Sequence, residues 1–388
     1  MYNDCEKNIM NILEEGISEG DIAGASVCAI YKDEEIIRLN AGFADKENNI
    51  PMKNDTVFRM FSMTKPVTAA AAMILLERGK ISLDDPLEKY IPEAEKLTVE
   101  DKNGKRPAKR GIYLKELLNM TSGLPYPEDT PAGRKAGTYF WETKNKLAEG
   151  KAVSTIEFAS LAVNSPLAFS PGDSMLYGTS ADVMGAVIEK AADMPFGEFI
   201  RKNITDPLEM PDTGFFITAE NRHRLSQIYV PDENGALVPF TDLHLCLTDY
   251  SAPPSFESGG AGLLSTIDDY KRFGGMLLNG GIFGGVRILK EETVKFMRTN
   301  SVDINIIKNM QWDSLVGYGY NCFMRTRLVR GVNGAGIEDF GWDGWTGNYF
   351  IADPAADLVY LYFIQKGGAG TSARCLNVKS EVYKALGK

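Results

Sequence analysis

The chain has 388 residues, of which 44% are hydrophobic and 24% charged, and its formal net charge is −10 at pH 7. This composition is typical of a globular protein and excludes general disorder. The negative charge argues against a nucleic-acid partner, because phosphates favour a basic surface, and the longest apolar run, residues 69–76, is too short to span a membrane.

Up to residue 297, the sequence predicts one helix, a hairpin of two strands, and then a series of further helices. Residues 4–19 carry apolar side chains at helical spacing, and residues 25–31 and 35–43 predict two strands joined by a hairpin turn. Helix-forming sequence begins at Ser62 and is strongest over residues 69–78. Further helices are predicted, between Gly/Pro-rich loops, over residues 114–120, 154–163, 181–191, 196–204, 267–278 and 290–297.

Strand patterns return only near the C-terminus. A closing helix over residues 373–386 follows strands predicted at residues 319–328, 349–352 and 358–364. Strands at both ends with helices between them predict an α/β (α+β) fold, in which one sheet flanked by helices is built from both chain ends. We expect residues 1–61 and 315–388 to form this sheet subdomain, and residues 62–314 to form a large, mostly helical insertion.

The cysteines and the N-terminal residues indicate the cellular compartment in which we expect the protein. The five cysteines are scattered and form no C-x-x-C pair, which favours free thiols over disulfides or a zinc site. Cys28 and Cys322 lie in apolar, strand-like stretches and are expected to pack in the core. The first residues are polar and lack the features of an export signal, so we expect a cytoplasmic protein without a metal.

Two familiar arrangements for nucleophilic catalysis are poorly supported. Residues 16–20 match the G-x-S-x-G elbow around Ser18, but that elbow leads from a strand into a helix, and here the predicted order is reversed. The chain has only two histidines, and neither His223 nor His244 lies in the context of a catalytic triad or a metal site. We interpret Ser18 as part of a helix end, and both histidines as surface or loop residues.

The remaining candidate is the S-x-x-K arrangement of Ser62 and Lys65, which occurs once in the chain and falls at a predicted helix start. Spacing of i and i+3 places the hydroxyl and the amine on one face of the helix. The unpaired N–H groups of the first turn favour a developing oxyanion and help the amine to lose its proton. We therefore predict Ser62 as a nucleophile activated by Lys65.

The same stretch begins an ordered series of motifs. Residues 61–68 and 77–87 resemble the serine β-lactamase/penicillin-binding-protein superfamily, and most closely its class C-like branch, which includes family VIII carboxylesterases. The likeness covers most of the chain and continues through residues 119–125, 170–177, 206–210, 259–266 and 340–344. It implies a β-lactamase/transpeptidase-like fold with an antiparallel sheet.

The resemblance also implies roles for individual residues. Ser62 attacks a carbonyl, Lys65 activates it, and Tyr177 occupies the second catalytic position, where its phenol needs a cationic Lys65 to act as a base at neutral pH. Backbone N–H groups of Ser62 and Trp345 form the oxyanion hole, and no cofactor is required. The aromatic residues expected around an apolar acyl pocket are Tyr126, Phe140, Trp141, Trp345 and Tyr349. Residues 124–150 are expected to form a flap over it.

The third motif departs from the β-lactamase form. Where β-lactamases carry Lys-Thr-Gly, this chain has Trp342, Asp343 and Gly344, and family VIII esterases often show Trp-Gly-Gly. The cation that meets the carboxylate of a β-lactam is missing, and Asp343 repels that carboxylate if it faces the pocket. Thr179 also stands where β-lactamases carry an Asn. The contacts that the side-chain amide of this Asn makes in β-lactamases are therefore less expected in this chain.

The pattern as a whole predicts an acyl-enzyme hydrolase that acts on a small-molecule ester, with amides, D-amino-acid peptides and β-lactams as lesser possibilities. Two alternatives remain. An acyltransferase would use the same acyl-enzyme with an alcohol or amine in place of water. A non-catalytic ligand-binding relative is the other, although it does not account for an intact Ser62, Lys65 and Tyr177.

Overall fold

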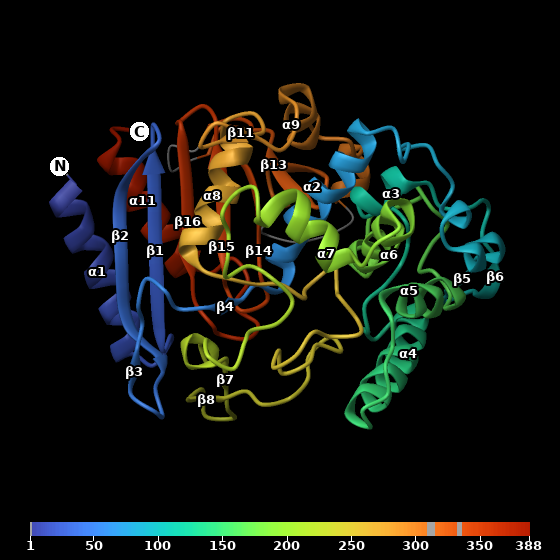
Figure 1. The fold of residues 1–388 in the computed structure, drawn as a ribbon, viewed down its shortest axis with the longest axis horizontal. Coiled ribbons are helices and arrows are strands. Elements are labelled where there is room, and N and C mark those ends of the chain that lie inside the picture. Colours follow the sequence, from blue (N-terminus) through green and yellow to red (C-terminus); the bar gives the residue numbers. More distant parts are fainter. Residues whose placement is uncertain (1, 309–314, 332–335) are drawn as a thin grey trace.

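The computed structural model describes residues 2–308, 315–331 and 336–388 (Figure 1). Its main feature is an eight-stranded sheet in the order β12-β13-β14-β15-β16-β1-β2-β3. Near its middle β1 (Gly24–Tyr31) pairs antiparallel with both β2 (Glu34–Asp45) and β16 (Leu358–Phe363). The two chain ends therefore meet inside one antiparallel sheet, which confirms the predicted fold class.

The C-terminal strands differ in detail from the prediction. The strand expected over residues 319–328 is a hairpin, because Cys322 and Phe323 both adopt positive φ (48° and 59°) between β12 and β13. The strand that carries the third motif, β14, was not predicted. The remaining strand bounds are β3 (Ile50–Pro51), β12 (Tyr318–Asn321), β13 (Met324–Arg327), β14 (Phe340–Asp343) and β15 (Tyr349–Asp353).

Helices cover both faces of the sheet (Figure 1). On one face α1 (Tyr2–Ser18) and α11 (Ala373–Ala385) pack on alternate residues of β1 and β16, with Ile9 and Val378 in the same cluster as Val27. On the other face lies α8 (Ile267–Leu278), whose Tyr270 ring is 5.5 Å from that of Phe350. The predicted division at residues 61/62 and 314/315 stays a prediction, and residue 314 lies outside the described residues.

The other helices gather beyond the β12 side of the sheet, around α2. Most follow the prediction, but α7 is short and continues as a π-helical turn over Arg201–Thr205, and an 18-residue helix, α4, occupies most of the predicted flap. Within the described ranges, no helix combines the length and hydropathy needed to cross a membrane. Their bounds are α2 (Thr64–Glu77), α3 (Leu114–Leu118), α4 (Pro131–Ala148), α5 (Thr155–Asn164), α6 (Ser180–Ala192), α7 (Phe196–Ile200), α9 (Glu291–Met297) and α10 (Ile304–Ile307).

Four two-stranded pairs complete the described structure. Three of them are local hairpins, whereas β4 and β9 join segments that lie about two hundred residues apart in the chain. This pairing fixes the segment that leads into Ser62 against the segment that follows Gly260. The pairs are β4 (Phe58–Arg59) with β9 (Leu264–Ser265), β5 (Thr98–Asp101) with β6 (Gly104–Pro107), β7 (Tyr229–Pro231) with β8 (Leu237–Pro239), and β10 (Ile282–Phe283) with β11 (Val286–Arg287).

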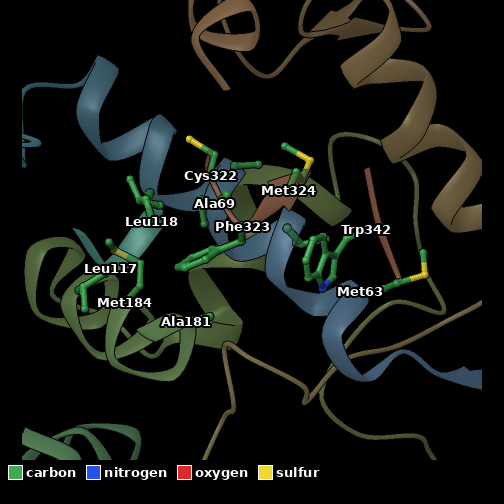
Figure 2. Close-up of a cluster of buried hydrophobic side chains, with 14 of the residues drawn as sticks. Met63, Ala69, Leu117, Leu118, Ala181, Met184, Cys322, Phe323, Met324 and Trp342 are labelled. Atoms are coloured by element: carbon green, nitrogen blue, oxygen red, sulfur yellow. The ribbon is translucent and has the colours of Figure 1, made fainter. Parts of the chain in front are cut away.

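The core beneath α2 combines segments that are distant in sequence (Figure 2). Met63, directly before α2, and Ala69 of α2 lie among Leu117 of α3, Met184 of α6 and Trp342 of β14. Every residue of α2 from Thr64 to Leu75 is buried, which a helix can be only when it is surrounded by other elements. All five cysteines are free and buried, as expected for Cys28 and Cys322.

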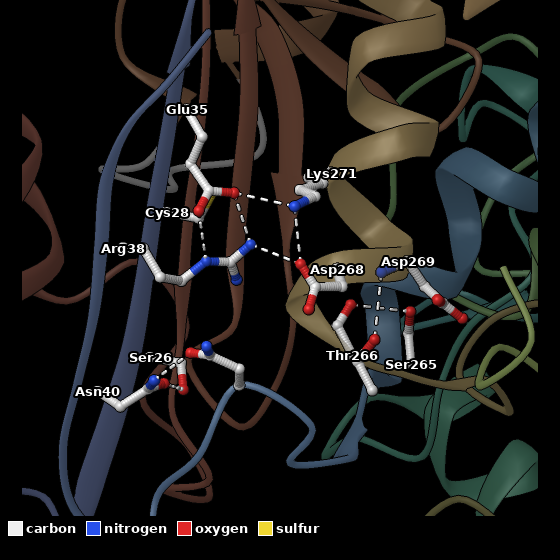
Figure 3. Close-up of polar contacts among 11 residues, drawn as sticks. Ser26, Cys28, Glu35, Arg38, Asn40, Ser265, Thr266, Asp268, Asp269 and Lys271 are labelled. Atoms are coloured by element: carbon white, nitrogen blue, oxygen red, sulfur yellow. Dashed lines mark hydrogen bonds and ion pairs between the residues drawn. The ribbon is translucent and has the colours of Figure 1, made fainter. Parts of the chain in front are cut away.

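A charged network ties α8 to the outer part of the sheet (Figure 3). Arg38 of β2 donates to Glu35 and to Asp268, and Lys271 of α8 donates to both of these carboxylates. Burial alone would raise the pKa of Glu35, but hydrogen bonds from Arg38 and Lys271 lower it to about 2. The carboxylate therefore stays ionised over the physiological range, and the tether does not depend on pH there.

Candidate active site

Ser62 lies on a single 3-10 turn, η1 (Phe61–Met63), that leads directly into α2. Phe61 has a positive φ of 46°, a strained conformation for an aromatic residue, and it turns the chain sharply out of β4. Phe61 and Met63 are buried, whereas Ser62 is partly exposed and lines a cavity. The fold thus presents one hydroxyl to the cavity and buries its neighbours.

Lys65 lies one turn further along and is fully buried. Its Nζ is 3.2 Å from Ser62 Oγ and 2.8 Å from the carbonyl oxygen of Gly260. Burial lowers the pKa of Lys65 to about 7, although the negative charges of Asp182 and Asp343 oppose that change. Near neutral pH, a substantial fraction of the side chain is therefore a neutral amine that can accept a proton from Ser62.

Tyr177 approaches the same pair from the segment before α6. Its hydroxyl accepts a hydrogen bond from Trp342 Nε1 at 3.0 Å, and Lys65 Nζ lies 4.5 Å from the centre of its ring. Burial raises the pKa of the Tyr177 phenol above its ordinary value, although hydrogen bonds with Ser62 and Trp342 act in the opposite direction. The phenol therefore stays protonated at neutral pH. Of the two groups, Lys65 is therefore the one with a form that can accept a proton near neutral pH.

A second tyrosine reaches Lys65. The hydroxyl of Tyr126, predicted only as an apolar wall residue, is 3.2 Å from Lys65 Nζ. Its segment passes very close to Gly178, where an added Cβ would stand 1.9 Å from the carbonyl oxygen of Leu124. A glycine directly after Tyr177 is therefore required, and it was the one signal in the sequence for this close approach.

Asp182 of α6, which the sequence reasoning missed, is buried behind the amine. It accepts hydrogen bonds from Ser258 Oγ at 2.5 Å and from the N–H of Gly260 at 3.0 Å. The carbonyl of Gly260 is the group that holds Lys65. An acidic residue directly before the apolar run 183–188, five positions after Tyr177, was the available signal, because a buried carboxylate needs partners.

The third motif closes the other side of the site. Trp342 and Asp343 line the cavity from the end of β14, but Gly344 does not. A Cβ at Gly344 would stand 2.6 Å from the carbonyl oxygen of Met60, so only glycine lets this strand end approach the turn that carries Ser62. Asp343 does face the cavity, but its charge is compensated, because Oδ2 accepts from Arg325 at 2.8 Å. The expected repulsion is therefore weaker than that of a lone carboxylate.

The cavity has a volume of about 630 Å³ and is walled largely by apolar and aromatic side chains. Trp345 stacks on His244, with ring centres 4.2 Å apart, and Trp141 of α4 is 66% exposed at the rim. His244 is a loop residue, as expected, but it lines the cavity, whereas His223 is exposed elsewhere. Besides Tyr177 and Trp342, the apolar and aromatic part of the wall includes Tyr126, Phe140, Trp141, Leu243, Leu245 and Trp345.

Two expectations about the site need correction. Tyr349 was expected in the acyl pocket, but it is buried in the sheet, in the hydrophobic cluster that includes α1 and α11. Side chains alternate between the two faces of the sheet along β15, so Tyr349 points to the face opposite the one on which Phe350 packs. The predicted flap over residues 124–150 is mostly the regular helix α4, which supplies Phe140 and Trp141 to the cavity wall.

Comparisons with known proteins place this geometry in context. A family model described as Beta-lactamase matches residues 6–378. An uncharacterized protein of Mycobacterium tuberculosis is 34% identical over 373 residues, which cover 91% of this chain and 88% of that protein. Esterase EstB of Burkholderia gladioli is 27% identical over 281 residues, which cover 67% of either chain.

Solved structures show the same fold. EstCE1, described as a hydrolase with promiscuous acyltransferase activity, superposes with a TM-score of 0.82 at 23% identity, covering 98% of this chain and 99% of that one. The family model spans almost the whole chain, and the ordered motifs from Ser62 to Gly344 all lie within the matched residues. The chain belongs to the Beta-lactamase family.

Proposed function

We propose that this protein is a serine hydrolase that cleaves small esters through an acyl-enzyme on Ser62. The observation that carries the proposal is the position of Lys65 Nζ, 3.2 Å from Ser62 Oγ and buried so that its pKa falls to about 7. A serine hydroxyl is a weak nucleophile until an adjacent base removes its proton. Here the base is an amine, and no imidazole is needed.

The reaction proceeds in two steps. Neutral Lys65 accepts the proton as Ser62 Oγ bonds to the ester carbonyl, and the oxyanion is stabilised by the N–H groups of Ser62 and Trp345. As the carbonyl re-forms and the C–O bond breaks, the proton passes to the leaving alcohol, with the Tyr177 hydroxyl as the relay. Water then attacks the acyl-enzyme and gives its proton to the same pair, which passes a proton to Ser62 Oγ as the C–O bond breaks and the acid leaves.

Three features support an ester over a β-lactam as the substrate. Trp342 stands where β-lactamases carry a cation, and Asp343 places a carboxylate oxygen in the cavity. The lining cation Lys144 is engaged with Asp242 at 2.6 Å. The walls are mainly aromatic and suit an apolar acyl or alcohol group. EstB, a relative, is an esterase.

The proposal is tested by comparing a short-chain nitrophenyl ester with a chromogenic cephalosporin at equal enzyme concentration. A missing ion pair to a substrate carboxylate costs about 2–5 kcal/mol, so we expect kcat/KM to be higher for the ester by about 30-fold or more. Faster cleavage of the cephalosporin would overturn the ester assignment and leave the acyl-enzyme chemistry in place. Failure to turn over either substrate, together with no labelling of Ser62 by a fluorophosphonate, would favour the non-catalytic ligand-binding alternative.

An acyltransferase is the second candidate, and the size and apolar character of the cavity favour it. About 630 Å³ leaves room for an alcohol beside a bound acyl group, and an apolar alcohol gains more from such walls than water does. EstCE1, which shares the fold, is described as having promiscuous acyltransferase activity. Product analysis with a competing alcohol decides between them: an ester product that grows with alcohol concentration identifies transfer.

The position of Asp182 leads to a prediction about pH. Its charge stabilises the ammonium form of Lys65, so Asp182→Asn lowers the pKa of Lys65 and moves the acid limb of kcat/KM to lower pH. Because an Asn oxygen still accepts from Gly260, the maximum falls by less than about tenfold, whereas Asp182→Ala frees that peptide and costs about 100-fold. The matched control is Ser258→Ala, which removes the hydrogen bonds of Ser258 Oγ with Asp182 and with the N–H of Ala261 but no charge, and it leaves the limb in place. An unmoved limb in Asp182→Asn would contradict this role.

A further inference from the structure

Asp343 has two carboxylate oxygens in different surroundings. Oδ2 accepts from Arg325 Nη1 at 2.8 Å and from the Thr371 hydroxyl at 2.5 Å. Within the described part of the chain, Oδ1 receives no hydrogen bond. It is not among the buried side-chain atoms that lack a partner, and Asp343 lines the cavity with 18% of its side chain exposed. One oxygen is thus held by the protein, and the other is open to a bound molecule.

Arg325 fixes both the charge and the orientation of this carboxylate. Its side chain is 2% exposed and lies under the site, with its guanidinium 5.4 Å from the ring of Trp342 and 5.1 Å from that of Tyr349. Although burial alone would lower it, the carboxylate of Asp343 raises the pKa of Arg325, so the guanidinium stays charged. The pair has no net charge, and the carboxylate cannot rotate Oδ2 out of the cavity wall without unpairing a buried cation.

The cavity therefore contains an acceptor-only oxygen close to the nucleophile. Asp343 lines the same cavity as Ser62 and Tyr177, and its neighbour on β14, Trp342, donates to the Tyr177 hydroxyl. A substrate group that only accepts hydrogen bonds would leave Oδ1 desolvated and unpaired, which is costly, whereas a donor would satisfy it.

We infer that Asp343 Oδ1 selects esters that carry a hydrogen-bond donor, a hydroxyl or an amide N–H, near the scissile carbonyl. The inference rests on the proposed ester hydrolysis and specifies its substrate class. A hydrogen bond to a charged acceptor favours the donor-bearing ester over an isostere that lacks the donor, by about tenfold or more in kcat/KM. Esters with a carboxylate at the same position are disfavoured.

Two matched substrate pairs test the inference, with turnover followed by acid release in a pH-stat. Ethyl N-acetylglycinate and ethyl 4-oxopentanoate differ only by an N–H in place of a CH₂ on the acyl side. The esters of butanoic acid with ethane-1,2-diol and with propan-1-ol differ by a terminal hydroxyl in place of a methyl on the alcohol side. We expect the donor-bearing member to be preferred in one pair, and the pair that responds identifies the side that meets Asp343.

The isosteric variant Asp343→Asn inverts the polarity of this contact. Arg325 and Thr371 both donate to Asp343 Oδ2, so in the variant the amide oxygen takes the place of Oδ2 and the amide N–H₂ faces the cavity. The preference for the donor-bearing ester should be lost or reversed. Only the ratio between paired substrates is compared, so any effect on Lys65 cancels. Thr371→Val, which removes one bond to Oδ2 and leaves Oδ1 untouched, should keep the wild-type ratio.

The outcomes separate the inference from the function on which it rests. A wild-type ratio near one in both pairs, with ready turnover of every ester, would overturn the role of Asp343 and leave the esterase intact. An unchanged ratio in a folded Asp343→Asn protein would do the same. No turnover of any ester would instead remove the proposed function. If Asp343→Asn does not fold, the wild-type ratios alone decide the question.

Discussion

Ser62→Ala is expected to abolish ester turnover, with kcat lowered by about 10⁴-fold or more, because it removes the hydroxyl that Lys65 is placed to activate. The hydroxyl is the partly exposed group on an otherwise buried turn, so its loss leaves the packing of η1 unchanged. Lys65 keeps its contacts with Gly260 and Tyr126. The variant should therefore fold normally, and its melting temperature should be close to that of the wild type.

The matched control for this variant is Ser18→Ala. Ser18 is the serine of the G-x-S-x-G match, but it is exposed at the end of α1 and its hydroxyl donates to the carbonyl of Glu15. We expect full activity in Ser18→Ala and loss of fluorophosphonate labelling in Ser62→Ala alone. Normal turnover by Ser62→Ala would remove the whole mechanism, and loss of activity in Ser18→Ala would redirect attention to the other end of the chain.

The fold was predictable where local pattern and long-range packing agree. The helical periodicity of residues 4–19 and the strand-like run of residues 25–31 reappear as α1 and β1, and Lys32 and Asp33 adopt the positive φ of a tight hairpin turn. The i, i+3 spacing of Ser62 and Lys65 likewise anticipated their contact, because it depends only on helix geometry.

The two elements that the sequence did not predict, β14 and α4, depend in part on features that the periodicity of the sequence does not reveal. β14 is four residues long and contains a glycine, and it is a strand because β13 and β15 flank it. Residues 124–150 were predicted to be a flap because they are rich in Gly, Pro and charge. Thr130, however, accepts from the N–H of Gly133 and Pro131 occupies the first turn of α4, which are both helix-start signals.

The same limit applies to the charges of the site. Arg325 lies on β13 and Asp343 on β14, and their pairing depends on strand register that no local pattern supplies. Without Arg325, an acidic residue in the third motif predicts simple repulsion of anions. When Arg325 is paired with it, Asp343 is instead a hydrogen-bond acceptor of fixed orientation whose charge is compensated. The partners of Asp182 were hidden for a similar reason, because Ser258 and Gly260 lie nearly eighty residues further along the chain.

The largest effect after loss of the nucleophile is expected from Lys65. Lys65→Met should lower kcat/KM by about 10³-fold or more, within the range typical of a general base in a positioned pair. Lys65→Arg should be equally impaired, because a guanidinium keeps the positive charge but cannot give up its proton at any accessible pH. The exposed Lys80 offers a matched control, and Lys80→Met should retain wild-type activity.

The pH dependence of the wild type checks the same assignment without a mutation. Lys65 has a pKa lowered to about 7, so the amine is protonated and inactive below that pH and neutral and active above it. We therefore expect kcat/KM to fall about tenfold for each unit of pH below about 7 and to level off above it. Substantial activity in Lys65→Arg, or a wild-type profile that stays flat down to pH 5, would show that the amine acts only through its charge. The proton of Ser62 would then have to leave by way of Tyr177, whose buried phenol is poorly suited to lose its own.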